Sequence, residues 1–175
     1  MSADEPIFHV SNSMEFFGRL IANYPEFWRK VGNLETKLLA DQLENNELKS
    51  PVYVTGLARS GSTILLETLA QIPGVVSHRY KDFPPVYTPY WWNWFMNQAG
   101  AGAGKPQERA HRDGIMVTPD SPEAIEEVIW IGAFNQLHNP AVSNALTAAA
   151  ANPEFDRFYR EHLKKLLLSR GGSRY

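Results

Sequence analysis

The stretch Pro51-Val52-Tyr53-Val54-Thr55-Gly56-Leu57-Ala58-Arg59-Ser60-Gly61-Ser62-Thr63 decides which fold this sequence predicts. It begins as an apolar run, breaks at a glycine, and continues directly into Ile64-Leu65-Leu66-Glu67-Thr68-Leu69, which is typical of a helix. We therefore predict a strand, a tight loop and a helix. The two glycines have the spacing of the phosphate loop G-x-x-x-x-G-K-[ST], but Ser62 occupies the lysine position.

The residues of this loop suit an anion. Glycine permits the positive φ angles that turn successive N–H groups inward, and a helix start adds unpaired donors and the positive end of the helix dipole. Hydroxyl groups and a guanidinium add further donors. The predicted phosphate ligands are Gly56, Arg59, Ser60, Gly61, Ser62 and Thr63. The alternative is a glycine turn that only reverses a strand into a helix.

Composition limits the class of protein. The 175 residues suffice for one domain with a sizeable core, and 43% hydrophobic with 12% aromatic residues excludes a disordered chain. A net charge of −2 gives no reason to expect a nucleic-acid partner. The absence of cysteine fits a reducing cytoplasm and excludes thiolate metal sites. Residues 1–10 do not resemble a secretory signal, and no apolar run is long enough to predict a membrane span.

Helices dominate the regions on either side of the loop. Apolar residues recur at intervals of three and four between Ser13 and Leu48, which predicts two amphipathic helices that bury an aromatic stripe in a core. We assign residues 1–50 to a helical N-terminal extension. Helices are also predicted in the aromatic segment that ends at Met96, from Asp120 to Phe134, over the alanine-rich residues 141–151, and from Pro153 to Ser169.

A second parallel strand is predicted at Val75-Val76-Ser77-His78, after a connection long enough for a crossover. Only two convincing strands are present, both before residue 80. A doubly wound sheet has more strands, so we expect residues 51–175 to be the amino-terminal part of an α/β domain that is truncated. Exposed edges of such a sheet would allow a homo-oligomer.

Two segments together resemble a known family. Pro51 to Glu67, taken with Ser77-His78-Arg79-Tyr80-Lys81-Asp82-Phe83-Pro84, is similar to the amino-terminal half of bacterial sulfotransferases that use 3′-phosphoadenosine 5′-phosphosulfate. The donor loop of that family reads G-x-x-R-S-G-[ST]-T, which residues 56–63 match. The aromatic run 90–95 and the segment 166–175 are also similar, so the resemblance covers about residues 50 to 175. It implies a P-loop-like three-layer α/β fold with a parallel sheet, here expected to be incomplete.

The resemblance also implies roles for individual residues. Arg59 and the loop N–H groups would hold the 5′-phosphate of the donor without a metal ion. A small hydroxyl or amine acceptor must lose a proton, and Asp82 is the first candidate base, with His78 as the second. Lys81 would steady the sulfuryl oxygens. Alternatively, Asp82 only caps a turn or pairs with Arg79, and His78 is a hydrogen-bonded structural histidine.

Two other functions stay open at this point. A nucleotide or small-molecule kinase would need lysine at position 62 and a Mg²⁺ site. A non-catalytic nucleotide-binding fragment would keep the loop alone, since no segment before Tyr175 matches the family's 3′-phosphate-binding arginine and serine. The remaining histidines have no metal-ligand spacing and are predicted to be surface or core residues. Arg170 would either reach the donor or lie at a solvated helix end.

Overall fold

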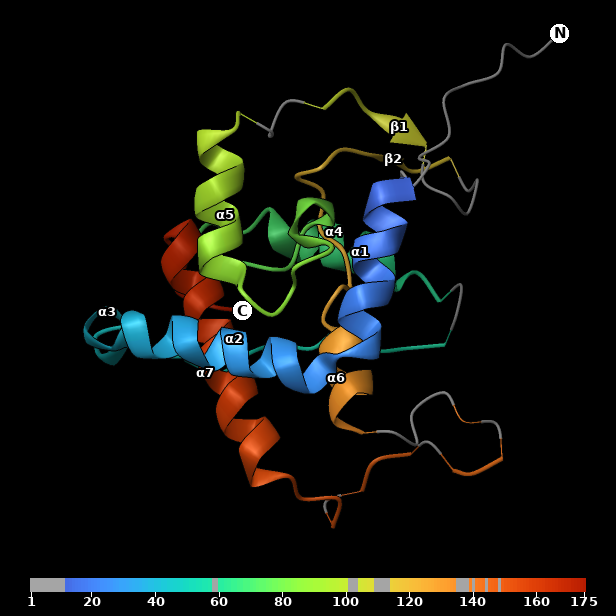
Figure 1. Cartoon of the computed structure of the whole chain (residues 1–175). Helices are drawn as coiled ribbons and strands as arrows, with labels where there is room; N and C mark the ends of the chain where they lie inside the picture. The colour runs from blue at the N-terminus through green and yellow to red at the C-terminus, as the bar shows by residue number, and fades with distance from the viewer. Residues whose placement is uncertain are drawn as a thin grey trace, which may run out of the picture.

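The computed structural model describes residues 12–57, 60–100, 104–108, 114–134, 139, 141–143, 145–147 and 149–175, and the structural statements below concern those residues. Helices make up most of the ordered structure, as Figure 1 shows. The elements in chain order are α1 (Asn12–Asn23), α2 (Pro25–Leu38), α3 (Ala40–Glu44), α4 (Ser62–Ala70), the 3₁₀ turn η1 (Tyr80–Asp82), α5 (Pro89–Gln98), β1 (Gln107–Glu108), β2 (Met116–Val117), α6 (Glu127–Ala133) and α7 (Pro153–Arg170).

The long C-terminal helix α7 has clear start and stop signals and is the centre of the core. The Asn152 side chain caps its start by accepting a hydrogen bond from Phe155 N, and Pro153 occupies the first turn. Gly171, at a φ of 64°, ends it in the left-handed conformation. Helices α2, α3 and α5 pack against α7, which runs behind α2 in Figure 1. The buried apolar side chains of α7 are Phe155, Phe158, Tyr159, Leu163, Leu166 and Leu167.

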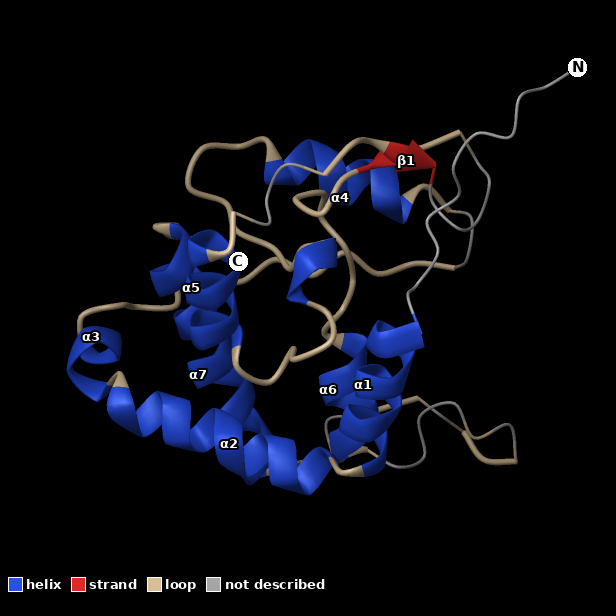
Figure 2. Cartoon of the chain, turned by 45° about the horizontal axis from the view of Figure 1, so that its top comes forward, coloured by secondary structure: helices blue, strands red, loops and turns tan. Residues whose placement is uncertain are grey.

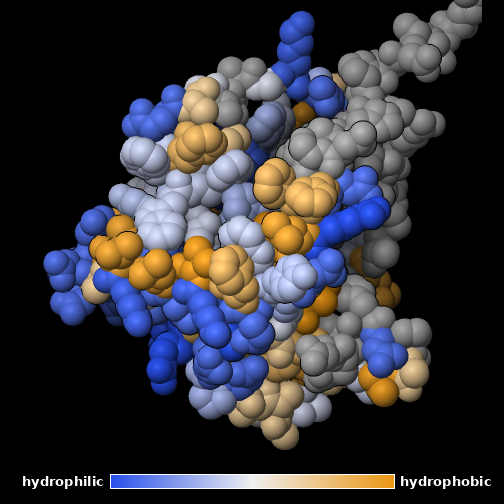
Figure 3. Space-filling view, in the orientation of Figure 1, coloured by the Kyte–Doolittle hydropathy of each residue, from blue (hydrophilic) through white to orange (hydrophobic). Residues whose placement is uncertain are grey.

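Residues 13–48 were predicted to form two helices; they form three, α1 to α3, which end at Glu44. The predicted burial of their aromatic stripe is only partly correct. Ile21, Leu39 and Leu43 are buried. Other large apolar side chains of α1 and α2 face solvent, and Figure 3 shows apolar groups gathered over these helices. The exposed members on these two helices are Phe16, Phe17, Phe27, Leu34 and Leu38.

Two other helix predictions need correction. Helix α6 begins only at Glu127. The start of the predicted helix is instead a turn, in which Ser121 Oγ accepts from Thr118 N at 3.0 Å. No helix forms in the described residues between 141 and 151. A short alanine-rich segment has little helical stability without a packed face.

The predicted three-layer P-loop-like fold with a parallel sheet is wrong. The sheet found among the described residues consists of β1 and β2, which pair antiparallel with Gln107 opposite Val117 and Glu108 opposite Met116. Residues 51–55 and 75–78, both predicted to be strands, are extended or bent segments without a ladder. Figure 2 shows the resulting predominance of helix.

These two extended segments are joined by the end of the chain. Val52 N donates to Tyr175 O at 2.8 Å, and Val76 N donates to Arg174 O at 2.8 Å. Val75 and Arg174 form an isolated parallel bridge. Residues 174–175 therefore lie between the two segments. Residue 52 has one such hydrogen bond to the chain end, and residues 74–76 have three to residues 173–174, which together make only an isolated bridge and no ladder.

The described helices include none that is both long and apolar enough to cross a membrane. The division of the chain at residue 50 stays a prediction.

Candidate functional site

The predicted phosphate loop is an open turn in front of α4. Ser60 N donates to Leu57 O at 3.1 Å, and Gly61 adopts a left-handed φ of 87° directly before the helix. Glycine reaches this conformation at little cost. At Gly56, an added Cβ would lie 2.6 Å from Ser60 Oγ, a side-chain atom that can rotate away. Of the two glycines that the sequence singled out, Gly61 is therefore the one whose backbone conformation favours glycine.

The start of α4 is accessible from solvent. Gly56, Ser60 and Gly61 are exposed, whereas Ser62 and Thr63 are partly buried. The residue at the cap position, Gly61, supplies no side-chain hydrogen bond, and nothing lies within 4 Å of the place where its Cβ would be. Among the described residues, the positive end of this nine-residue helix thus lies next to the exposed Ser60 and Gly61. The predicted ligand Arg59 lies outside the described residues.

The candidate bases Asp82 and His78 lie together but are buried. Both side chains are at most 1% exposed, with His78 Nδ1 3.2 Å from Asp82 Oδ2. The same carboxylate oxygen accepts a hydrogen bond from Arg79 N at 2.8 Å, which caps η1. Arg170 donates to the other oxygen, Oδ1, at 2.5 Å. Asp82 therefore does cap a turn, as the alternative interpretation expected.

The surroundings of Asp82 satisfy its carboxylate fully. Asn93 Nδ2 lies 3.3 Å from Oδ1, and Arg170 also donates to Ser77 O. Burial by itself would raise the pKa of Asp82, but the hydrogen bond from His78 and the nearby charges of Arg170 and His78 lower that pKa far below its ordinary value. A carboxylate held in this way is a weak base. The geometry consequently favours a structural role for Asp82 in this conformation.

A second histidine extends the buried network. His162 Nε2 lies 3.0 Å from His78 Nε2, so one ring donates and the other accepts. His162 is completely buried, and its Nδ1 has no hydrogen-bond partner among the residues that the structure describes. Burial, followed by the charges of His78, Lys165 and Arg170, lowers the pKa of His162 well below its ordinary value. The network runs from Arg170 through Asp82 and His78 to His162.

The sequence did not predict the two network residues that α7 contributes, His162 and Arg170. His162 was expected at the surface or in the core, and it lies in the core. Arg170 was expected near the donor or at a solvated helix end, but its side chain is 6% exposed and pairs with Asp82. The only local signal is that both residues lie on one face of α7, eight positions apart.

Lys81 points to a different place. Its Nζ lies 2.8 Å from Asp120 Oδ1, and Arg79 approaches the same oxygen at 2.9 Å. Although burial raises the pKa of Asp120, these two cations lower it overall. Arg79 and Asp120 line a polar hollow of about 320 Å³, which Glu67 of α4 also borders. Lys81 and Asp82 are neighbours in the sequence, but their side chains therefore bind different partners.

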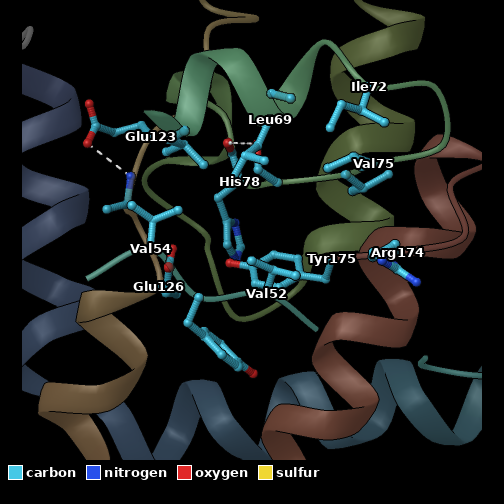
Figure 4. A pocket seen from close by; sticks show the side chains of 16 residues that line it. Val52, Val54, Leu69, Ile72, Val75, His78, Glu123, Glu126, Arg174 and Tyr175 are labelled. Atoms are coloured by element: carbon cyan, nitrogen blue, oxygen red, sulfur yellow. Dashed lines mark hydrogen bonds between the residues drawn. The ribbon is translucent and has the colours of Figure 1, made fainter. Parts of the chain in front are cut away.

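A mainly apolar cavity of about 170 Å³ lies beneath α4 (Figure 4). The described residues contain no group of three or more metal-ligating side chains placed to hold an ion.

Comparison with known proteins adds no relative: no protein-family model, no curated protein and no solved structure matches this chain. The site must therefore be interpreted from its own geometry and from the resemblance of its motifs.

Proposed function

We propose that this chain binds the 5′-phosphate end of 3′-phosphoadenosine 5′-phosphosulfate at Gly56–Thr63 and transfers its sulfuryl group to a hydroxyl or amine of a small acceptor. The observation that supports binding is the start of α4, which follows the exposed, left-handed Gly61 and which no side chain of the described residues caps at that position. The choice of a phosphosulfate donor depends on the resemblance of residues 51–67 and 77–84. It does not depend on a three-layer sheet, which is absent from the described residues.

In this reaction the bond between sulfur and the bridging phosphate oxygen breaks, and a bond from sulfur to the acceptor oxygen or nitrogen forms. The negative charge that develops on the departing phosphate would be stabilised by the first N–H groups of α4 and by Arg59. The acceptor proton needs a base. Asp82 and His78 are enclosed in hydrogen bonds. Proton transfer to Asp82 would require its ion pair with Arg170 to open, and transfer to His78 would require its contact with Asp82 or His162 to open.

Because both candidate bases are enclosed in hydrogen bonds, the structure also favours an alternative function, which is nucleotide binding without turnover. A kinase is less well supported, because Ser62 stands where the phosphate loop of kinases has lysine. Binding and turnover must therefore be measured separately.

Calorimetric titration with adenosine 3′,5′-bisphosphate in the presence of EDTA tests the binding step, with ATP plus Mg²⁺ as the comparison. We expect saturable, metal-independent binding of the bisphosphate. Arg59→Ala should weaken it by about tenfold or more, because a charge-assisted hydrogen bond to phosphate is lost. The matched control is Arg19→Ala, since Arg19 is an exposed arginine on α1 that pairs with Glu15.

Equal affinity of the Arg59→Ala and Arg19→Ala proteins, or preference for ATP with Mg²⁺, would contradict the proposal. Sulfuryl transfer to a panel of phenols and amines then decides between the two functions. Turnover supports the sulfotransferase, whereas tight binding without turnover of any acceptor supports the binding protein.

A further inference from the structure

The cavity beneath α4 is independent of the phosphate loop and has two unlike walls. Its apolar wall comes from α4 and from the extended segments on either side of that helix. On the other wall lie His78, Glu126 and Tyr175, and Figure 4 shows these three facing the hollow opposite Leu69 and Val75. The apolar lining residues are Val52, Val54, Leu66, Leu69, Ala70, Ile72, Val75, Val76 and Ala124, and the remaining lining residues are Tyr53, Ser77, Glu123 and Arg174.

Glu126 supplies one unsatisfied group in this wall. Its Oε2 is buried and has no hydrogen-bond partner among the described residues. Both ring nitrogens of His78 are already used, Nδ1 by Asp82 and Nε2 by His162, so His78 offers the cavity only its ring surface. An unpaired buried acceptor is costly unless a ligand or water satisfies it.

The size and lining of the cavity favour a ligand over water. A buried water needs two to four polar partners, and a cavity of roughly 150 Å³ lined by aliphatic side chains stays dry and admits a benzene-sized molecule. The present cavity, at about 170 Å³, is of that size and has one free acceptor at its edge. A ligand can enter the cavity by local opening of α4, the helix that roofs it, because no residue of α4 is fully buried.

We infer that this cavity binds a small phenol-type molecule, with the aromatic ring between α4 and Val75–Val76 and the hydroxyl donating to Glu126 Oε2. The ring replaces the missing packing under α4, and the hydroxyl satisfies the orphan carboxylate oxygen. This site involves none of the phosphate-loop residues 56–63, so it can exist whether or not the chain binds a nucleotide.

Titration of the ¹⁵N-labelled chain with p-cresol, with toluene as the comparison, tests the inference by NMR. We expect saturable shifts of the amides of Val54, Leu69 and Val76. Toluene should bind about tenfold more weakly, because it cannot donate to the carboxylate. Glu126→Leu should remove that difference between the two probes.

Two matched variants test the location. Leu66→Trp fills the cavity and should abolish binding, whereas Leu65→Trp places the same side chain at the neighbouring, 51% exposed position and should leave binding unchanged. Absence of saturable shifts in the wild-type chain, equal binding of both probes, or retained binding by Leu66→Trp would overturn the inference. Because the shift map and the toluene comparison use the wild-type chain, they remain decisive even if a variant does not fold.

Discussion

At the scale of single residues, the Asp82 carboxylate is held in place by hydrogen bonds from several sides. It accepts from Arg79 N and from Arg170, and His78 approaches it from a third direction. These contacts link η1 to the last turn of α7. Their consequence is that Asp82 stabilises the fold as an anion and is withdrawn from proton transfer.

The pair of His162 and His78 predicts a pH dependence of stability. The pKa of His162 is lowered in the folded chain, so below about pH 6.5 the unfolded chain binds a proton that the folded chain does not. The stability supplied by neutral His162 is therefore present above that pH and is lost as the pH falls. We expect the free energy of unfolding to decrease between about pH 7 and pH 5.

Urea denaturation at several pH values measures this effect. His162→Gln keeps a polar group near His78 but cannot be protonated, so its stability should depend less on pH in the same range. The titration of Asp82 does not interfere, because its pKa is lowered from a value of 3.8. Parallel pH profiles for the wild type and His162→Gln would show that His162 is not the titrating group.

The loop before α4 could be predicted from the sequence, whereas the buried hydrogen-bond network around Asp82 could not. Gly61 was predictable because its left-handed backbone conformation is a local reason for glycine. His78 and Asp82 were located at the end of an extended segment, but their burial depends on Arg170 and His162, more than eighty residues later in the chain. No local pattern specifies such partners.

At the scale of elements, α4 depends on the conformation of the glycine before it. Gly61 has a φ of 87° with open space around its Cβ position, so a side chain there meets backbone strain without steric contact. Gly61→Ala should lower the free energy of unfolding by about 1 kcal/mol. Gly61→Asn should cost less, because asparagine tolerates the left-handed region.

Thermal denaturation of Gly61→Ala and Gly61→Asn measures how much each substitution lowers stability. If alanine and asparagine are equally harmless, the left-handed turn before α4 does not persist in solution. The same two variants can be tested in the titration with adenosine 3′,5′-bisphosphate. We expect backbone strain at position 61 to weaken bisphosphate binding more than it lowers the free energy of unfolding.

The sequence was informative about helices and misleading about strands. Helix α7 could be predicted because its cap, its proline and its final glycine are local signals. The runs Val52–Val54 and Val75–Val76 suited buried parallel strands, and they are extended. However, an apolar run does not determine whether a neighbouring segment supplies a full ladder. Here the last residues of the chain give the first run one hydrogen bond and the second run only an isolated bridge.

At the scale of the whole molecule, one buried ion pair joins three helices. Lys165 Nζ lies 2.8 Å from Glu35 Oε2, and both side chains are completely buried. Lys165 also donates to Gly32 O at 2.9 Å, while Glu35 Oε1 accepts from Trp91 N at 2.7 Å in the first turn of α5. The pair thus fixes α2 and α5 against α7. Burial raises the pKa of Glu35 and lowers that of Lys165, and the attraction between them opposes both changes.

A double-mutant cycle on this pair tests whether it holds the helices together. Lys165→Met alone should lower the free energy of unfolding by about 3–5 kcal/mol, because it leaves a buried carboxylate without its counter-charge. Glu35→Gln retains an acceptor for Trp91 N, and combining it with Lys165→Met should recover a large part of that loss. The exposed pair Glu15–Arg19 is the control, where the corresponding cycle should give at most about 0.5 kcal/mol. If Lys165→Met costs no more than Arg19→Met in urea denaturation, the arrangement of α2, α5 and α7 does not depend on this contact and must come from the apolar core alone.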